Sequence, residues 1–120
     1  MQPDLQTQIV GLNFDARRRT KGLPDLLVFE NRELDGTFTA LGSITGKWCI
    51  DEVAAETQGG AIPEFQVVAT WRSGIDQLAQ ACSAVNVGGT RYEKRAVDPA
   101  VGRPAVVRLR CQPITGYASY

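Results

Sequence analysis

Few residues in this chain are of the types that do chemistry, and they form no recognisable constellation. The 120-residue sequence contains no histidine, which removes the usual general base, metal ligand and neutral-pH switch. It contains no phosphate-binding loop and no G-x-G-x-x-G or G-x-S-x-G motif. The adjacent acids Asp51 and Glu52 offer an acid–base pair, but no other group converges on them. We therefore expect no catalytic residues, no metal, no cofactor and no enzymatic activity.

The three cysteines are the remaining reactive side chains. Cys49, Cys82 and Cys111 are an odd number at no metal-like spacing. Cys49 and Cys111 fall inside predicted strands, where a thiol is usually a small core residue. The sequence shows no cationic, apolar leader and no apolar run near the roughly 20 residues of a membrane span. These features predict three reduced, structural cysteines in a soluble cytoplasmic protein.

A basic cluster near the N-terminus is a candidate contact surface. Arg17, Arg18, Arg19 and Lys21 form the only such cluster in the chain. It is either a solvated face or a contact patch for an acidic partner or phosphates. Over the whole chain, thirteen basic residues balance thirteen acidic ones, so general attraction to nucleic acid or an anionic membrane is not supported. The aromatic residues Trp48, Phe65 and Trp71 fall on apolar strand faces rather than among basic residues, unlike those of a nucleic-acid-binding sheet.

The segment Asp51–Pro63 is a second candidate contact element. It has three acids, a glycine pair and a proline, without sustained periodicity. Long loops inside small domains tend to be functional or disordered. The segment is interpreted as a mobile contact loop, a passive surface loop or an undetected strand. The candidate contact residues are Asp51, Glu52, Glu56, Gln58, Gly59 and Gly60.

The element that organises the rest is a predicted β-meander over Ala84–Cys111. Val85 and Val87 alternate with smaller or polar residues, and Gly88-Gly89 suits a tight type I′ turn. The strand Thr90–Val97 is predicted to place Tyr92 and Ala96 on one face. After a loop over residues 98–104, a third strand presents its apolar residues on one face and its arginines on the other. The apolar residues are Ala105, Val107, Leu109 and Cys111, and the arginines are Arg108 and Arg110.

The first half predicts further strands and one short helix. Strands are expected at Leu26–Arg32, at Ile44–Ile50 with Trp48 as a core anchor, and at Phe65–Arg72. Asp35-Gly36 predicts a turn between two strand candidates. Ile75–Ala81 predicts a helix of one or two turns with Ile75, Leu78 and Ala79 inward. The face of Phe65–Trp71 is expected to pack with that of Ala105–Cys111.

Residues 1–22 fit two patterns. Leu5, Ile9, Leu12 and Ala16 share a helical face, and Gly22 followed by Pro24 is a helix stop. Alternation from Val10 to Ala16 also fits a strand, so spacing does not decide. The length and the basic last turn favour a helix. The expected fold is a single domain over 1–120: mainly β, a small antiparallel β-barrel or closed meander with a short helix and an N-terminal helical or extended segment.

One arrangement resembles a known family. A strand and a short helix are followed by V-N-V-G-G-T-R-Y, a loop containing Asp-Pro, and A-V-V-R-L-R-C. This order is similar to the C-terminal half of bacteriophage head–tail connector proteins, the stopper or head–tail joining family. Lys94 stands where that family usually has an apolar residue. The matching residues are Val85, Val87, Gly88, Gly89, Tyr92, Val97, Asp98, Pro99, Arg108 and Leu109.

The resemblance implies a structural virion protein in the neck of a tailed phage, assembled in the host cytoplasm. It implies a β-barrel subunit of a ring, a hexamer by analogy, between the portal-adaptor protein and the tail-terminator or tail tube protein. Genomic DNA would pass through the ring without sequence-specific binding, and no membrane is involved. The acids of Asp51–Pro63 would then repel DNA phosphates. The alternatives are a tail-terminator subunit of the same neck region, or a small cellular β-barrel adaptor that binds proteins.

Overall fold

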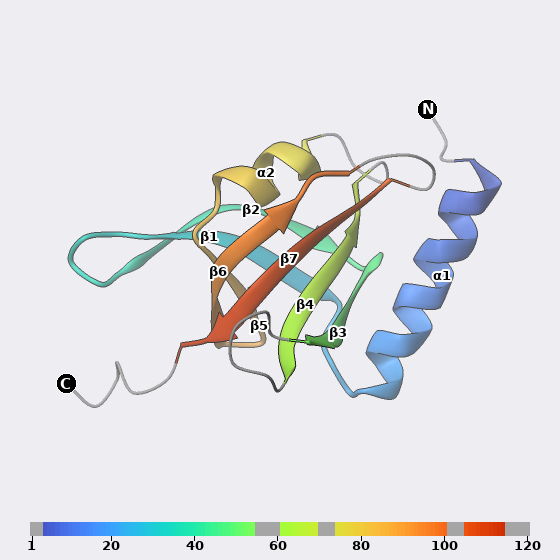
Figure 1. The fold of residues 1–120 in the computed structure, drawn as a ribbon, viewed down its shortest axis with the longest axis horizontal. Coiled ribbons are helices and arrows are strands. Elements are labelled where there is room, and N and C mark those ends of the chain that lie inside the picture. The colour runs from blue at the N-terminus through green and yellow to red at the C-terminus, as the bar shows by residue number, and fades with distance from the viewer. Residues whose placement is uncertain (1–3, 55–60, 70–73, 101–104, 115–120) are drawn as a thin grey trace.

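The computed structural model describes residues 4–54, 61–69, 74–100 and 105–114, and over these it is mainly β (Figure 1). Seven strands form one antiparallel sheet in the order β2-β1-β5-β6-β7-β4-β3, and two helices accompany it. The helices are α1 (Leu5–Thr20) and α2 (Ile75–Ala81). The strands are β1 (Leu26–Arg32), β2 (Phe38–Thr45), β3 (Trp48–Ala54), β4 (Ala61–Val68), β5 (Ala84–Val87), β6 (Thr90–Asp98) and β7 (Val106–Pro113).

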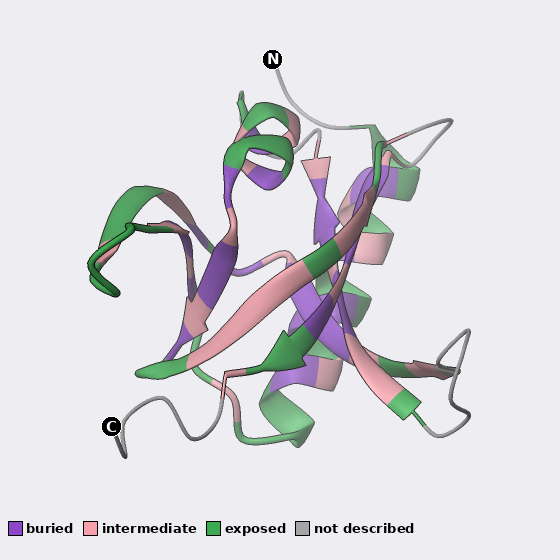
Figure 2. Ribbon diagram, turned by 60° about the vertical axis from the view of Figure 1, so that its left-hand side comes forward, coloured by how far each residue is buried: buried purple, intermediate pink, exposed green. Residues whose placement is uncertain are grey.

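The sheet is open rather than closed into the predicted barrel. Strands β2 and β3 follow each other in the chain but lie at opposite edges, and they are not paired in the described sheet. The sheet nevertheless curls around one core, because Ile44 of β2 and Trp48 and Ile50 of β3 join the same buried cluster (Figure 2). The class prediction of an antiparallel, mainly β fold is confirmed, and closure is corrected to an open, curled sheet.

The predicted meander is present as β5, β6 and β7. Gly88 and Gly89 have φ of 58° and 90°, as a type I′ turn requires. Val107, Leu109 and Cys111 of β7 are fully buried, as predicted. Strand β4 lies beside β7 in the sheet, with Phe65 paired to Leu109.

Strand β6 departs from the predicted alternation. A register shift between Lys94 and Ala96 inserts one extra residue opposite β7. The shift moves Val97, not Ala96, onto the core side with Tyr92. The prediction that Ala96 shares a face with Tyr92 was therefore wrong. Lys94 donates from Nζ to the carbonyls of Ala79 and Gln80, at 3.1 and 2.8 Å, where α2 ends.

The predicted strand over Ile44–Ile50 is two strands. Gly46 and Lys47 both have left-handed φ, 75° and 63°, and they separate the end of β2 from the start of β3. The sequence pattern did not indicate this bend, because Ile44, Trp48 and Ile50 lie at even spacing as in one strand and all reach the core. Trp48 is fully buried, as predicted.

Both described ends of the predicted loop over Asp51–Pro63 are strand. Asp51–Ala54 belongs to β3, and its residues pair with Ala61–Glu64 of β4. The undetected-strand reading was therefore right for both ends of the segment. Glu56, Gln58, Gly59 and Gly60 lie outside the described residues, as does Trp71.

Helix α2 has the predicted bounds, and it covers the main core with Ile75 and Ala79 fully buried. Helix α1 covers the other face of the sheet over β3 and β4 (Figure 1). There Phe14 packs with Cys49, Val68 and Val106 in a second cluster. None of the helices within the described ranges is long and apolar enough to cross a membrane.

The helical reading of residues 1–22 is confirmed over Leu5–Thr20, and the shared apolar face points outward. Asp4 caps α1 by accepting a hydrogen bond from the Thr7 N–H at 2.8 Å, and Gly22 has the left-handed φ of 72° common after a helix end. The predicted apolar face is exposed: Leu5, Ile9, Leu12 and Ala16. The buried residues are Thr7, Gly11, Phe14, Asp15 and Arg18.

Candidate interaction surfaces

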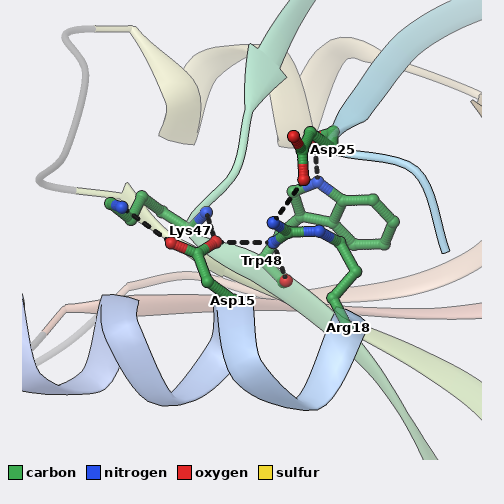
Figure 3. A network of polar contacts seen from close by, with 5 residues as sticks. All are labelled: Asp15, Arg18, Asp25, Lys47 and Trp48. Carbon is green, nitrogen blue, oxygen red and sulfur yellow. Dashed lines mark hydrogen bonds and ion pairs between the residues drawn. The ribbon is translucent and has the colours of Figure 1, made fainter. Parts of the chain in front are cut away.

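A buried ionic network attaches the C-terminal half of α1 to the sheet (Figure 3). The guanidinium of Arg18 donates to Asp15 Oδ1 at 2.6 Å, to Asp25 Oδ1 at 2.8 Å and to the Trp48 carbonyl at 3.0 Å. It also lies 5.4 Å from the centroid of the Trp48 ring. The Arg18 side chain is only 1% exposed, so these partners replace the hydration of its two terminal nitrogens, while Nε is buried without a hydrogen-bond partner among the described residues.

Asp15 is the acceptor at the other end of this network. Its carboxylate accepts from the backbone N–H and from Nζ of Lys47, both at 2.7 Å. Burial by itself would raise the pKa of Asp15, but the hydrogen bonds from Lys47 and Arg18 outweigh it and hold the pKa below its ordinary 3.8. Asp15 is therefore ionised at neutral pH.

The same carboxylate stabilises the bend between β2 and β3. Lys47 is the only non-glycine residue among the described ones with a positive φ. A left-handed backbone is costly for a residue with a side chain, and the two hydrogen bonds to Asp15 offset that cost. The preceding Gly46 fits closely, since a Cβ there would lie 3.2 Å from Asp15 Oδ1. The network thus fixes α1 and the bend together.

The predicted basic contact patch is mostly taken up by this attachment. Arg18 is buried, so it belongs neither to a solvated face nor to a contact patch. Arg17 donates to Asp51 at 2.6 Å, and this hydrogen bond raises the pKa of Arg17. Lys21 donates from Nζ to the carbonyl of Ile50. Arg19 is exposed and remains a candidate contact residue.

The outward face of α1 is apolar. Leu5, Ile9 and Leu12 are 70%, 49% and 63% exposed, and Ala16 continues the same row one turn on. The spacing of four, three and four residues makes one stripe along the helix. We call these four residues the α1 stripe. A lone exposed leucine needs no explanation, but a contiguous apolar row marks a contact surface.

The hairpin of β1 and β2 is a second exposed element, and it projects from the sheet on the side away from α1 (Figure 1). At its tip, the Asp35 side chain accepts from the N–H and the hydroxyl of Thr37, at 3.0 and 2.6 Å. These hydrogen bonds lower the pKa of Asp35. Leu34 is fully exposed beside Asp35 and Glu33. We call Glu33, Leu34 and Asp35 the hairpin tip.

A polar cluster holds the base of this hairpin. Glu30 is nearly buried and accepts from Arg91 Nε of β6 at 2.8 Å. The Arg91 guanidinium lies 4.3 Å from the centroid of the Phe38 ring, at the start of β2. Because β1, β2 and β6 are joined at this point, the hairpin leaves the sheet in a defined direction.

The groups considered for catalysis remain apart. Asp51 and Glu52 lie in β3, and Asp51 is occupied by Arg17. Cys49, Cys82 and Cys111 are free and buried, as predicted for Cys49 and Cys111. Burial raises the pKa of each thiol, that of Cys111 to about 12. Within the part of the chain that is described, no three acidic or cysteine side chains cluster as a metal site would require.

A hollow lies on the outer side of β1 and β5. It is lined by Pro24, Leu26, Val28, Asn86, Gly88 and Gly89. Its lining carries no charged side chain, so nothing there would fix the orientation of a polar ligand.

No family model matches the chain, and neither a curated protein nor a solved structure gives a significant match. The exposed surfaces on α1 and on the β1–β2 hairpin are the candidate sites of interaction.

Proposed function

We propose that the protein is a structural subunit of a tailed bacteriophage, a ring-forming head–tail connector between the portal-adaptor protein and the tail. The resemblance of Val85–Cys111 to the stopper family supports this proposal. The balance of thirteen basic and thirteen acidic residues also supports it, since a conduit must let DNA pass without gripping it.

One observation carries the proposal: the α1 stripe and the hairpin tip, two surfaces of different chemistry, lie at opposite ends of the molecule (Figure 1). A subunit with one self-complementary patch tends to form a twofold dimer, in which the same patch of both copies is in contact. Two different patches on opposite sides favour head-to-tail contacts, and such contacts generate a ring when the rotation closes. A ring-forming subunit needs this second arrangement.

The direct test is assembly on phage particles. Purified protein is incubated with DNA-filled heads that lack their neck proteins, with tails, or with both, and the products are imaged by electron microscopy. A connector is expected to form a ring on the head vertex and to restore tail attachment. Binding to tails alone would favour the tail-terminator alternative, and binding to neither would overturn the proposal.

A control variant separates binding from folding. Gln77→Cys labelled with a bulky maleimide changes an exposed position of α2, away from both apolar surfaces, and should join particles normally. The wild type is first shown to be folded by its unfolding transition, so that a failure to bind heads and tails counts against the proposal and is not caused by unfolding.

A further inference from the structure

We propose that the hairpin tip of one copy docks on the α1 stripe of the next copy. This inference deepens the proposed ring and rests on it, because it names the contact that joins neighbouring subunits. Leu34 would insert between the side chains of the stripe, and the flanking acids would face the basic end of α1.

The apolar parts of the two surfaces match in kind and size. The stripe offers three large side chains that are about half exposed or more, Leu5, Ile9 and Leu12. The gap between successive stripe residues on a helix is a hole of the type that accepts a single aliphatic side chain from a partner. Leu34 is fully exposed at the turn between β1 and β2, so its side chain is accessible to such a hole.

The charges flanking the two surfaces are complementary. The hairpin tip carries two carboxylates, from Glu33 and Asp35, on either side of Leu34. The stripe runs toward Arg19, which is exposed three residues after Ala16. The opposite end of the stripe begins directly after Asp4, the exposed acidic cap of α1, which would repel the carboxylates of the hairpin tip. Charge therefore favours docking of the tip on the C-terminal half of the stripe, near Leu12.

Both surfaces are held in place by buried polar groups, which favours a defined contact. Arg18 and Asp15 fix α1 from its inner side, so the stripe faces outward. Glu30 and Arg91 fix the base of the hairpin. A contact between two ordered surfaces avoids most of the entropy of ordering them on binding.

The competing occupant is the α1 stripe of a second copy. The stripe has the spacing of a coiled-coil seam, so two helices could pair along it. A parallel pair would bring the basic helix ends together, and an antiparallel pair would avoid this repulsion. Such a twofold pair would leave the hairpin tip exposed, would use no acidic group, and would close as a dimer.

Cysteine cross-linking distinguishes these arrangements. Leu34→Cys and Leu12→Cys are made in separately tagged full-length chains and mixed under mild oxidation at the highest soluble concentration. The three native thiols are buried, so the introduced thiols react first. We expect a disulfide between the two different variants and, from the double variant, a ladder of linked chains.

The same mixtures contain the contrary outcomes. A Leu12→Cys dimer formed as readily as the mixed product would establish the twofold helix pair and overturn the hairpin contact. Gln77→Cys mixed with Leu34→Cys is the control for random collision, since Gln77 is exposed on α2. A mixed product no more abundant than this control would also overturn the inference.

Charge reversal supplies a second readout. Glu33→Arg and Arg19→Glu should each lower the yield of the Leu34–Leu12 cross-link by roughly two- to fivefold at low salt, the range for an exposed ion pair. Combining the two reversals should restore most of the yield, and high salt should reduce the differences. Two independent losses without restoration would show that Arg19 does not face Glu33.

The outcome can be separated from that of the connector proposal. Rings on phage heads without this cross-link would leave the connector standing and remove the hairpin contact. A specific cross-link from a protein that binds neither heads nor tails would establish the contact and remove the connector.

Discussion

The two faces of α1 invert the usual arrangement of an amphipathic helix. The face against the sheet carries a fully buried arginine, a buried aspartate, a buried threonine and a glycine, with Phe14 as its large apolar residue. The face toward solvent carries Leu5, Ile9 and Leu12. Burial of apolar area drives most helix docking, so this helix needs another source of attachment.

That source is the ionic network around Arg18, and its design explains the inversion. Four groups from two segments outside α1 meet the guanidinium and the Asp15 carboxylate: Asp25, Lys47 and the Trp48 carbonyl and ring. Polar attachment is directional and fixes the helix orientation. The apolar residues are thereby left for an outside contact. The difference between the faces teaches that hydrophobic spacing alone does not identify the inner side of a helix.

The strongest test of this comparison is Arg18→Met. The variant keeps much of the side-chain volume but leaves Asp15 buried with one cation fewer. Breaking a buried ion pair costs about 3–5 kcal/mol, so the free energy of unfolding should fall by about that amount. Urea unfolding measures it, with Arg19→Met as the matched control because Arg19 is exposed one position on. Equal losses in the two variants would contradict the inward placement of Arg18.

Asp15→Asn tests the acceptor side and its pH dependence. The pKa of Asp15 is lower in the folded chain than its ordinary 3.8, so its ionisation stabilises the fold above that pH. This contribution is lost as pH falls through the folded-state pKa. The variant should be less stable by about 2–4 kcal/mol at neutral pH, and the gap should narrow below about pH 4.

Glu52→Gln is the control for Asp15→Asn, since Glu52 is exposed in β3. Its stability should differ little from that of the wild type across the pH range. A gap for Asp15→Asn that stays constant down to pH 2 would show that the carboxylate charge is not what holds Lys47 and Arg18.

Gly11→Ala should have a smaller effect on the same inner face. Alanine favours a helix over glycine by about 0.5–1 kcal/mol. At this position, however, a Cβ would lie 2.8 Å from Cδ of Lys47, whose Nζ is bonded to Asp15. We expect the displacement of Lys47 to outweigh the helix preference, with a net loss of about 1 kcal/mol in thermal or urea unfolding. Asn13→Ala, on the exposed face, should instead raise the free energy of unfolding by a few tenths of a kcal/mol. A similar increase for Gly11→Ala would show that Lys47 can move away from the new Cβ at little cost.

Local signals predicted the elements whose residues determine their own structure. Strand β1 and helix α2 have the predicted bounds, and Gly88-Gly89 adopts the positive φ values that only glycine takes easily. The turn between β1 and β2 contains Asp35-Gly36, as predicted, and Gly36 there also has a positive φ. In each case the decisive interactions lie within a few residues, so spacing was enough.

Long-range partners decided what the sequence could not show. Lys47 adopts a left-handed backbone because Asp15, distant in the chain, accepts its hydrogen bonds. One additional residue in β6 moved Val97 to the core side, and no spacing rule announces such a bulge. The basic cluster looked uniform, yet Arg18 and Arg19 have opposite environments because only Arg18 reaches Asp25 and Trp48. A mid-helix aspartate three residues before an arginine was the one available hint of the network.

The outward face gives the smallest effect on folding and thereby the sharpest form of the comparison. In the triple variant Leu5→Gln, Ile9→Gln, Leu12→Gln, each side chain is already about half exposed or more, so little apolar contact is lost. Each change should alter the free energy of unfolding by less than about 0.5 kcal/mol in dilute solution. Phe14→Gln, on the same helix but 7% exposed, should cost several kcal/mol, because it removes the centre of the second core cluster.

Sedimentation at high concentration should show the reverse order, with the triple variant losing self-association that a folded wild type displays. A triple variant that unfolded as readily as Phe14→Gln would mean that the stripe supports the fold of its own chain and is not a surface for another.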